Sequence, residues 1–451
     1  MNPSIFKAYD IRGVYPEEVN ENTAHKIGLA FAKYAKAKNI MVGEDARVSS
    51  PALRDALVRG LTDSGVNVVL AGVCTTPLFY FSVASTKNID AGIMITASHN
   101  PGKYNGFKMV WGDASPIEPS AIQKITNNEL RITNNKKNGI IKNINVADAY
   151  VQKLLTLVSA KKIPPVKIVI DAGNGTAGIT AEKLLAKLPQ LKSKNIFFEI
   201  DMSFPNHEAN PIKPENMTAL RAEVISAQAD FGAAYDGDAD RIGFVDEKGQ
   251  QVGADLIYAA ILPQIISRKT KSTALYDLRC SKIVPETITA LGGTPRMTRV
   301  GHAFIKKDIA KYHAVAAAEL SAHYYFQKFY GADCADLTLL YLLAEINRQK
   351  KPLSQIIAPF KKYFQSGEIN FEVKNKDAAI AAILKKYKKS ATKFTDIDGI
   401  RLEFKDGADF WWLSVRASNT EPLLRLNMEA SNQKLLNEKL QELQKMLENM
   451  I

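Results

Sequence analysis

The first part of the chain alternates between two patterns of apolar positions. Stretches with apolar residues at helical spacing alternate with short apolar runs, and the helical stretch 51–65 has a proline in its first turn and a glycine at its end. Short apolar strands separated by helices are typical of parallel βαβ units. We therefore expect helices over 22–37, 51–65 and near 77–86, and strands over 39–43, 66–72 and 91–96.

The alternation starts again further along the chain. A polar segment rich in Asn and Lys, 127–143, leads out of the first unit. A second α/β pattern begins at 166–178 and runs through 230–249, and a third begins near Ala254. After 361–373 the pattern changes to paired strands and helices, and it ends in an amphipathic segment.

These patterns predict an α/β fold. We expect three tandem α/β domains with mixed, mainly parallel sheets, followed by a smaller C-terminal α+β domain, all around a central cleft. No repeat is visible in the residues themselves, so the likeness of the first three units rests on element order alone. In such sheets the functional loops lie beyond the carboxyl ends of strands. The predicted domains are 1–145, 146–252, 253–366 and 367–451.

The composition is that of a globular protein. A chain of 451 residues with 46% hydrophobic positions is too long for a single core. The first residues show no basic segment followed by an apolar one, so we expect no signal peptide, and no apolar run is long enough to span a bilayer. The cysteines Cys74, Cys280 and Cys334 are far apart, which suggests reduced thiols rather than a disulfide or zinc site. We expect a cytoplasmic protein without a membrane partner.

The formal net charge of +12 raises the question of nucleic-acid binding. Lysine clusters such as 385–393 could attract phosphate backbones. They contain few aromatic residues and match no zinc-finger or RRM signature, so a solvated helix face explains them better. A basic protein suits a small anionic substrate equally well. We expect no nucleic-acid partner.

The stretch MITASHNPGKYNGFKMV (94–110) places Ser98 next to His99, directly after an apolar run. We expect this turn to be exposed. Ser, Asn, Pro and Gly are common turn residues, so an ordinary turn is one interpretation. The other interpretation is that Ser98 is a nucleophile or a carrier of a phosphoryl group.

The segment DGDADR (236–241) places three carboxylates at alternate positions in a tight loop. Hard cations such as Mg²⁺ and Ca²⁺ prefer oxygen ligands. An EF-hand would use Glu247 as its last ligand, but it requires a glycine where this chain has Arg241, and the flanking segments are typical of strands rather than helices. Three neighbouring carboxylates repel one another unless a cation offsets their charge. We predict a divalent metal site, with Mg²⁺ favoured if a phosphate supplies a further ligand.

Two further loops carry polar side chains next to strand-like runs. In ELSAH (319–323) the Glu and Ser project to the same side of an extended segment, which suits two neighbouring sugar hydroxyls; an ordinary hydrogen-bonded turn is the alternative. In VRASNTEPLLRL (415–426) a guanidinium, two hydroxyls and an amide could form a receptor for a phosphate dianion. A hairpin whose side chains satisfy their own backbone is the alternative there.

One motif points elsewhere. GNGTAG (173–178) follows a strand and fits the dinucleotide-binding pattern, with Glu199 and Asp201 at the spacing of the acidic residue. A dinucleotide site would leave the other polar loops unexplained. We interpret these glycines as allowing a tight turn from strand to helix.

Together the loops resemble the motifs of the α-D-phosphohexomutase family, in its bacterial phosphomannomutase/phosphoglucomutase branch. They follow one another in family order and span almost the whole chain. The matching segments are KAYDIRG (7–13), TASHNP (96–101), NGFK (105–108), DGDADR (236–241), VGHAFIK (300–306), AELSAH (318–323) and RASNTEP (416–422).

The resemblance implies a role for each motif. It implies that Ser98 carries the transferred phosphoryl group, with Arg12, Lys108 and His99 as further catalytic residues and either Lys108 or His99 as the general acid/base. The implied metal ligands are Ser98, Asp236, Asp238 and Asp240. The residues implied to bind the substrate are Tyr9, Arg241, Arg279, Gly301, His302, Glu319, Ser321, His323, Arg416, Ser418, Asn419, Thr420 and Arg425.

The chain departs from the family pattern at three positions. Ala318 and Ala322 stand where many members have glycine. Arg279 stands where a family lysine is expected, which keeps the charge but changes the geometry of the donors.

The resemblance implies an isomerase that interconverts hexose 6-phosphate and hexose 1-phosphate, for mannose and for glucose, through phosphoserine and a 1,6-bisphosphate intermediate. It implies Mg²⁺ as cofactor, glucose 1,6-bisphosphate or mannose 1,6-bisphosphate as activator, a phosphosugar as the binding partner, and a monomer or dimer. One alternative is a phosphoglucosamine mutase, whose sugar loop usually has Gln at the position of Leu320 and whose phosphate loop has Gly at that of Asn419. The other is a non-catalytic phosphosugar-binding protein.

Overall fold

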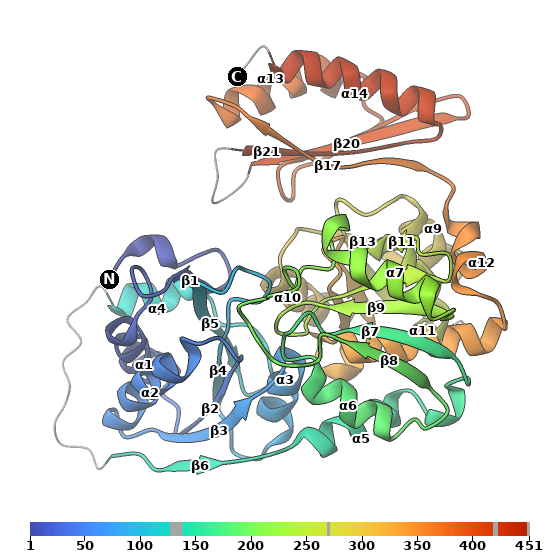
Figure 1. Cartoon of the computed structure of the whole chain (residues 1–451). Helices are drawn as coiled ribbons and strands as arrows, with labels where there is room; N and C mark the ends of the chain where they lie inside the picture. The colour runs from blue at the N-terminus through green and yellow to red at the C-terminus, as the bar shows by residue number, and fades with distance from the viewer. Residues whose placement is uncertain (127–137, 268–270, 418–422, 449–451) are drawn as a thin grey trace.

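The computed structural model describes residues 1–126, 138–267, 271–417 and 423–448. Four β-sheets, here numbered I to IV, follow one another along the chain, each with its own helices. Sheets I to III lie together, whereas sheet IV and its helices α13 and α14 form a separate layer at the top of Figure 1, which contacts the unit of sheet III through hydrogen bonds such as that from the Lys282 amide to Glu429. The predicted fold class is confirmed: three α/β units precede a C-terminal α+β unit.

Sheet I has six strands in the order β1-β5-β4-β2-β3-β6. The strands are β1 (Ile11–Val14), β2 (Asn39–Glu44), β3 (Asn67–Val73), β4 (Ala91–Ile95), β5 (Tyr104–Trp111) and β6 (Ile141–Asn143). The helices are α1 (Glu21–Ala35), α2 (Ser50–Asp63), α3 (Thr76–Ser85) and α4 (Pro119–Thr126). The elements predicted here are confirmed, with ends shifted by one or two residues.

Sheets II and III have five strands each. The elements of sheet II are α5 (Ala147–Leu157), β7 (Lys167–Asp171), α6 (Gly178–Ala186), β8 (Lys192–Ile196), α7 (Thr218–Ser226), β9 (Phe231–Tyr235), β10 (Ile242–Asp246) and β11 (Gln251–Val252). Those of sheet III are α8 (Ala254–Ile265), β12 (Thr273–Asp277), α9 (Ile283–Ala290), β13 (Thr294–Thr298), α10 (His302–Tyr312), β14 (Ala316–Ala318), β15 (Tyr324–Phe326), β16 (Ala332–Asp333), α11 (Ala335–Gln349) and α12 (Leu353–Ile357).

Sheets I, II and III share one strand order. Sheet II runs β8-β7-β9-β10-β11 and sheet III runs β13-β12-β14-β15-β16, so the second strand of each unit lies at one edge, next to the first. In sheet I the strands β3-β2-β4-β5 repeat that order. In all three sheets the third strand is parallel to the first, and the chain then turns back into a fourth strand that is antiparallel to the third. The loops between β4 and β5, β9 and β10, and β14 and β15 therefore occupy equivalent positions.

Sheet IV is antiparallel throughout, in the order β17-β21-β20-β19-β18. Its elements are β17 (Phe364–Glu372), α13 (Lys376–Tyr387), β18 (Lys393–Thr395), β19 (Ile400–Asp406), β20 (Asp409–Ala417), β21 (Leu423–Ala430) and α14 (Gln433–Glu448). The change to paired strands that the sequence predicts after 361–373 is confirmed.

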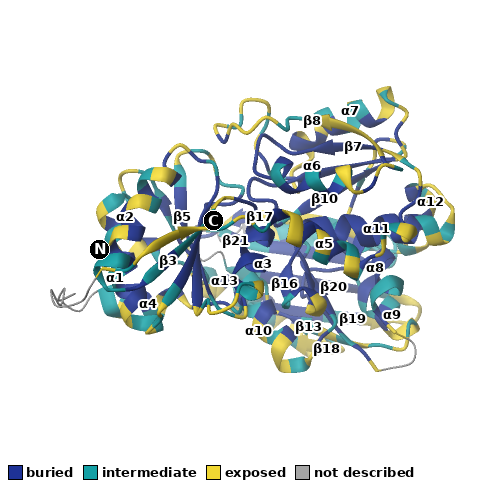
Figure 2. Cartoon of the chain, turned by 90° about the horizontal axis from the view of Figure 1, so that it is seen from below, coloured by how far each residue is buried: buried dark blue, intermediate teal, exposed yellow. Residues whose placement is uncertain are grey.

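The distribution of buried residues explains why three units lie together. One continuous apolar core joins residues around all of sheets I to III, among them Phe81, Tyr235 and Leu340. Helix α3 is central to it, because the segment is apolar on all sides and is buried along most of its length in Figure 2. Sheet IV has a core of its own, formed with α13 and α14.

Candidate active site

Ser98 lies in the loop between β4 and β5, where its backbone adopts a left-handed conformation with φ of 53°. Its amide donates to Thr96 Oγ1 at 2.9 Å. We expected this turn to be exposed, and for Ser98 that prediction is wrong: Ser98 is only 2% exposed, although Pro101 and Lys103 of the same turn are exposed. The loop between β9 and β10 covers it, and the Ser98 hydroxyl donates to Asp236 Oδ2 at 2.9 Å.

A buried arginine that the sequence analysis did not select holds this loop. The guanidinium of Arg47 donates to the carbonyl oxygens of Ser98 and Asn100 at 2.7 Å each, and to those of Pro101 and Tyr104 at 2.8 and 3.0 Å. Asp45 accepts from its Nε at 3.0 Å. A side chain that satisfies four carbonyls fixes the course of the whole turn.

The DGDADR loop forms the turn between β9 and β10, with Ala239 at φ of 58°. All three of its aspartates are buried, and one oxygen of each lies within 4.8 Å of the others. Asp236 Oδ1 accepts from the amides of Asp240 and Arg241 at 3.1 Å. Asp238 Oδ2 accepts from Thr76 and from Lys108 Nζ, each at 2.7 Å.

The electrostatics of this loop suit a cation. Burial, together with Asp240 and Asp238, raises the pKa of Asp236 well above its usual value. Burial alone would also raise the pKa of Asp240, but Lys108 and His323 hold it well below the usual range. Asp238 Oδ1 is buried without a hydrogen-bond partner among the described residues. Three converging oxygens and a buried, unpartnered carboxylate oxygen fit a divalent metal ion.

Lys108 and Arg12 bring positive charge to the same loops. Lys108 Nζ also donates to Asp240 Oδ2 at 2.5 Å, and the two aspartates raise its pKa well above the usual value although burial lowers it. Arg12 donates to Asn100 at 2.8 Å and pairs with Asp10 at 2.5 Å. Both cations therefore lie beside the Ser98 loop.

His99 has a different charge state from Lys108. Its Nδ1 lies 3.2 Å from the Ser98 hydroxyl. Burial, with Arg241 and Arg12 nearby, lowers the pKa of His99 well below its usual value. The imidazole is therefore neutral at pH 7 and can accept a proton, whereas Lys108 stays an ammonium.

His323 joins the metal loop to the sugar loop. It forms an isolated β-bridge with Arg241, its Nε2 lies 3.2 Å from Asp240 Oδ1, and its Nδ1 lies 3.3 Å from Glu319 Oε2. Burial lowers the pKa of His323, but the carboxylates of Asp240 and Glu319 raise it to about 9.

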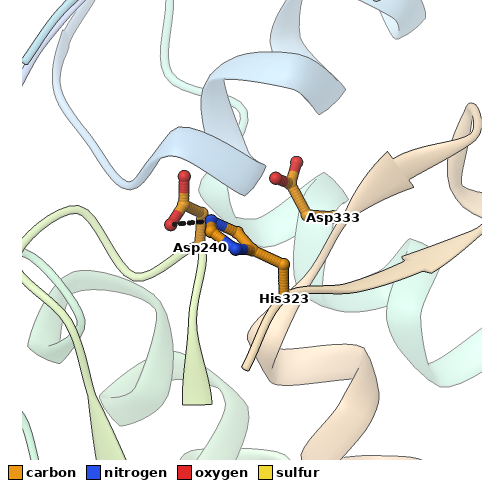
Figure 3. A group of neighbouring side chains, drawn as sticks. All are labelled: Asp240, His323 and Asp333. Atoms are coloured by element: carbon orange, nitrogen blue, oxygen red, sulfur yellow. Dashed lines mark ion pairs between the residues drawn. The ribbon is translucent and has the colours of Figure 1, made fainter. Parts of the chain in front are cut away.

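A second group of possible ligands, Asp240, His323 and Asp333, is drawn in Figure 3. His323 faces Asp240, and Asp333, whose nearest oxygen lies within 4.8 Å of their ligand atoms, is paired with Lys306 at 3.1 Å. Arg241 Nε donates to His323 Nε2 at 3.3 Å, so this nitrogen and Asp333 are both already engaged by protein cations. We therefore assign the metal site to the three aspartates of the DGDADR loop alone.

The sugar loop presents a fixed carboxylate. Glu319 is 2% exposed; its Oε1 accepts from the amide of Gly301 at 2.8 Å and its Oε2 from the Tyr325 hydroxyl at 2.6 Å. Ser321 Oγ lies 3.2 Å from His323 Nδ1. Gly301 adopts φ of 122°, and a Cβ there would lie 2.9 Å from Tyr9, so only glycine allows this contact.

Charged residues also gather between sheets III and IV. Arg279 is buried and pairs with Asp277 at 2.6 Å, while Arg416 and Arg425 lie directly opposite each other on β20 and β21. Glu368 on β17 faces all three guanidiniums. Tyr9 makes edge contact with His302 at 5.0 Å between ring centres. Ser418, Asn419 and Thr420 lie outside the described residues.

The glycine-rich GNGTAG segment supports the metal loop. Gly173 has φ of 54° in the turn from β7 to α6, as the tight-turn interpretation predicts. A Cβ on Gly175 would lie 2.6 Å from the carbonyl oxygen of Gly237. The amide of Thr176 donates to that same oxygen at 3.0 Å. The dinucleotide pattern is thus explained by close backbone packing against the DGDADR loop.

The EF-hand alternative does not agree with the structure. Glu247, which would be its last ligand, accepts from the backbone amide of Ser354 at 3.1 Å and contacts its hydroxyl. The flanks of the DGDADR loop are the strands β9 and β10.

Comparison with known proteins gives consistent results along the whole chain. Models of the phosphoglucomutase/phosphomannomutase family match in succession: alpha/beta/alpha domain I at residues 3–136, domain II at 148–249, domain III at 254–363 and the C-terminal domain at 368–446. No helix among the described residues is long and apolar enough to cross a membrane.

Individual proteins are similar over nearly their full length. The chain is 36% identical over 449 residues to a phosphomannomutase of Methanocaldococcus jannaschii, covering 98% of this chain and 97% of that protein. It is 36% identical over 440 residues to a phosphomannomutase/phosphoglucomutase of Pseudomonas syringae, with coverages of 95% and 92%. A crystal structure of a phosphoglucomutase/phosphomannomutase family protein from Burkholderia thailandensis superposes with a TM-score of 0.87 at 32% identity, covering 99% and 97%.

Proposed function

The chain belongs to the phosphoglucomutase/phosphomannomutase family, and from this membership we propose that it interconverts hexose 6-phosphate and hexose 1-phosphate through a phosphoserine at Ser98. As a member of this family it is an isomerase of the phosphohexomutase class. The observation that carries the proposal is the 2.9 Å contact between the hydroxyl of Ser98 and Asp236 of the triple-aspartate loop.

Transfer would begin with Ser98 phosphorylated. Its phosphoryl group passes to the free hydroxyl of the bound hexose phosphate, giving a 1,6-bisphosphate. The bisphosphate turns around, and its other phosphoryl group returns to Ser98. Phosphoryl transfer depends on positioning and on neutralising charge, which is what the residues around Ser98 provide.

The donor set around Ser98 is suited to Mg²⁺. Asp236, Asp238 and Asp240 would hold the ion together with an oxygen of the phosphorylated Ser98, and the unpartnered Asp238 Oδ1 supports this assignment. When bound, Mg²⁺ would neutralise charge on the transferring phosphoryl group. Glucose 1,6-bisphosphate or mannose 1,6-bisphosphate would serve as activator by phosphorylating Ser98.

Protein cations share this task. Lys108 and Arg12 lie beside the loop that carries Ser98, and Arg241 follows the third aspartate directly. Fixed donors aimed at a developing negative charge in a buried site stabilise a transition state strongly. We assign these three residues to the transferring phosphate.

The charge states divide the acid/base roles that the sequence leaves open. The first transfer moves one proton from the sugar hydroxyl to Ser98 Oγ, and the return moves it back. His99 is neutral and its Nδ1 is 3.2 Å from Ser98 Oγ, so it can pass this proton between the two oxygens. Lys108 stays an ammonium because its pKa is raised, which suits charge stabilisation rather than proton donation. We propose His99 as the general acid/base and Lys108 as a charge stabiliser.

The sugar would be held by Glu319 and Ser321 through its O3 and O4 hydroxyls. Gly301, His302 and Tyr9 would line the same subsite, with His323 fixing the loop. This grip ignores C2, where glucose and mannose differ, so both sugars are expected as substrates. The remaining phosphate would bind Arg279, Arg416, Arg425 and the loop residues Ser418, Asn419 and Thr420.

A phosphoglucosamine mutase is the nearest rival. Leu320 and Asn419 differ from the residues usual in that branch. Rates with mannose 1-phosphate, glucose 1-phosphate and glucosamine 6-phosphate, measured side by side with a trace of glucose 1,6-bisphosphate, decide between the two. Turnover of the amino sugar alone would refute our choice.

Replacement of Ser98 tests the carrier role. The variant Ser98→Ala should lose turnover and should lose the mass increase of one phosphoryl group that the intact wild-type protein is expected to show. Ser193, which is exposed on β8, provides the matched control in Ser193→Ala. Turnover that survives in Ser98→Ala would reject the proposal. A silent binding protein would bind the phosphosugars without turnover in either variant.

A further inference from the structure

One carboxylate lies among the three arginines between sheets III and IV. Glu368 Oε2 is 3.6 Å from Arg279 Nη1 and 3.7 Å from Arg416 Nη2, and its Oε1 is 3.6 Å from Arg425 Nη1. Glu368 was not among the residues that the sequence analysis selected.

The group brings three positive charges close together. Three guanidiniums face the carboxylates of Glu368 and of Asp277, which holds Arg279. Arg416 and Arg425 are directly opposite on neighbouring antiparallel strands, where like charges repel. Burial, Arg279 and Arg425 lower the pKa of Arg416, and Glu368 and Asp398 act against them. Glu368 therefore offsets a repulsion that the arrangement of the strands creates.

The contacts of Glu368 are loose. All three distances exceed the 2.7–3.2 Å typical of an N–H···O hydrogen bond. The side chain is 29% exposed, and Arg416 Nε is buried without a hydrogen-bond partner among the described residues. Among the described residues, charge attraction at 3.6–3.7 Å rather than short directional hydrogen bonds links this carboxylate to the arginines, so a phosphate that offers more acceptors can displace it.

We propose that Glu368 is a positioning residue that acts as an internal counter-ion of this receptor: it competes with the substrate phosphate for Arg279, Arg416 and Arg425 and so limits how tightly the phosphate is held. The benefit of such competition to the enzyme rests on the proposed function. A bisphosphate that must leave the receptor and return turned around gains from a receptor of limited affinity. Its physical basis, competition between two anions for three guanidiniums, does not depend on turnover.

Calorimetric titration with inorganic phosphate, on the full chain without added divalent cation, measures the competition directly. In Glu368→Gln the dissociation constant for phosphate should fall about five-fold, as expected when one negative charge is removed a few ångströms from a dianion near the surface. Glu372→Gln, an exposed position on the same strand, should leave the constant unchanged. Unchanged or weaker phosphate binding in Glu368→Gln would overturn the proposal, because it would make Glu368 a mere support for the arginines.

Two further measurements locate the effect and connect it to turnover. The gain from Glu368→Gln should disappear when Arg416 is also replaced, in Arg416→Gln/Glu368→Gln; a gain that persists belongs to another phosphate site and overturns the proposal. In turnover of glucose 1-phosphate, Glu368→Gln should lower KM and kcat together, whereas a structural defect lowers kcat and raises KM. If the wild-type protein showed no mutase turnover but Glu368→Gln still bound phosphate more tightly than the wild type, the result would support Glu368 as counter-ion and reject the proposed function.

Discussion

Removal of the Arg47 guanidinium is the sharpest test of how the Ser98 loop is held. The variant Arg47→Met keeps a side chain of similar length but deletes the donors to four carbonyl oxygens, those of Ser98, Asn100, Pro101 and Tyr104. It also leaves the carboxylate of Asp45 buried without its cation. Because Arg47 and Asp45 are both fully buried, water cannot replace these contacts at low cost.

The magnitude follows from the contacts. A hydrogen bond to a charged group contributes about 1.5–3 kcal/mol, but four bonds from one guanidinium are not additive. Removing one partner of a buried ion pair costs about 3–5 kcal/mol. We therefore expect the free energy of opening of this loop to fall by about 3–5 kcal/mol. A loop displaced by about 1 Å would lower kcat/KM roughly 100-fold.

Hydrogen exchange measured by mass spectrometry on peptides containing residues 96–104 reads out the opening directly. Exchange in Arg47→Met should accelerate at least 100-fold there, as expected from about 3 kcal/mol, while peptides from sheet IV keep the wild-type rate. Arg59→Met, an exposed arginine on α2, should change neither quantity. If Arg47→Met retained wild-type exchange in this loop and wild-type kcat/KM, the assignment of Arg47 as the anchor of Ser98 would be refuted.

Three further outcomes are expected. Burial raises the pKa of Cys74 to about 12 and all three thiols are buried, so iodoacetamide at pH 8 should label none of them in the folded protein and all of them after unfolding; labelling of the native chain would contradict this. Gly175→Ala places a Cβ 2.6 Å from the Gly237 carbonyl oxygen and should shift the DGDADR loop, so that metal-dependent activity falls at least ten-fold. The midpoint of a Mg²⁺ titration of the activity measures this effect, and an unchanged midpoint would contradict it. Ala322→Gly relieves a left-handed alanine at φ of 65° and should raise the unfolding free energy by about 1 kcal/mol without loss of turnover; a decrease in a denaturant titration would contradict the reasoning.

The elements of the fold could be predicted from the sequence because each has a local cause. Helix α1 begins after Asn20, whose side chain accepts from the amide of Thr23, and α2 has a proline in its first turn. The strands β2 and β4 are continuous apolar runs, as expected of central strands buried on both faces. Neither feature needs a contact with a distant part of the chain.

The site was predictable only as far as short motifs carry its chemistry. The aspartates and Ser98 stand in compact loops, whereas Arg47 acts through backbone carbonyls about fifty residues further along the chain, and nothing in its neighbourhood distinguishes it. The exposure of Ser98 was predicted wrongly for the same reason. Turn residues indicate exposure when only the turn is considered, but here the loop of sheet II folds over the turn of sheet I.

The shared strand order explains how remote motifs meet. The Ser98 loop, the DGDADR loop and the sugar loop each follow the third strand of a unit and lead into an antiparallel fourth strand. Each contains one residue other than glycine in the left-handed region: Ser98, Ala239 and Ala322. Such a conformation costs about 1 kcal/mol or more and persists only where the surroundings require it. Its presence at three equivalent positions indicates that one backbone design, used three times without visible repetition in the residues, aims three loops at a common point. Many family members have glycine at positions 318 and 322. The left-handed backbone at Ala322 explains the glycine at that position, whereas Ala318 ends β14 and does not need a left-handed backbone.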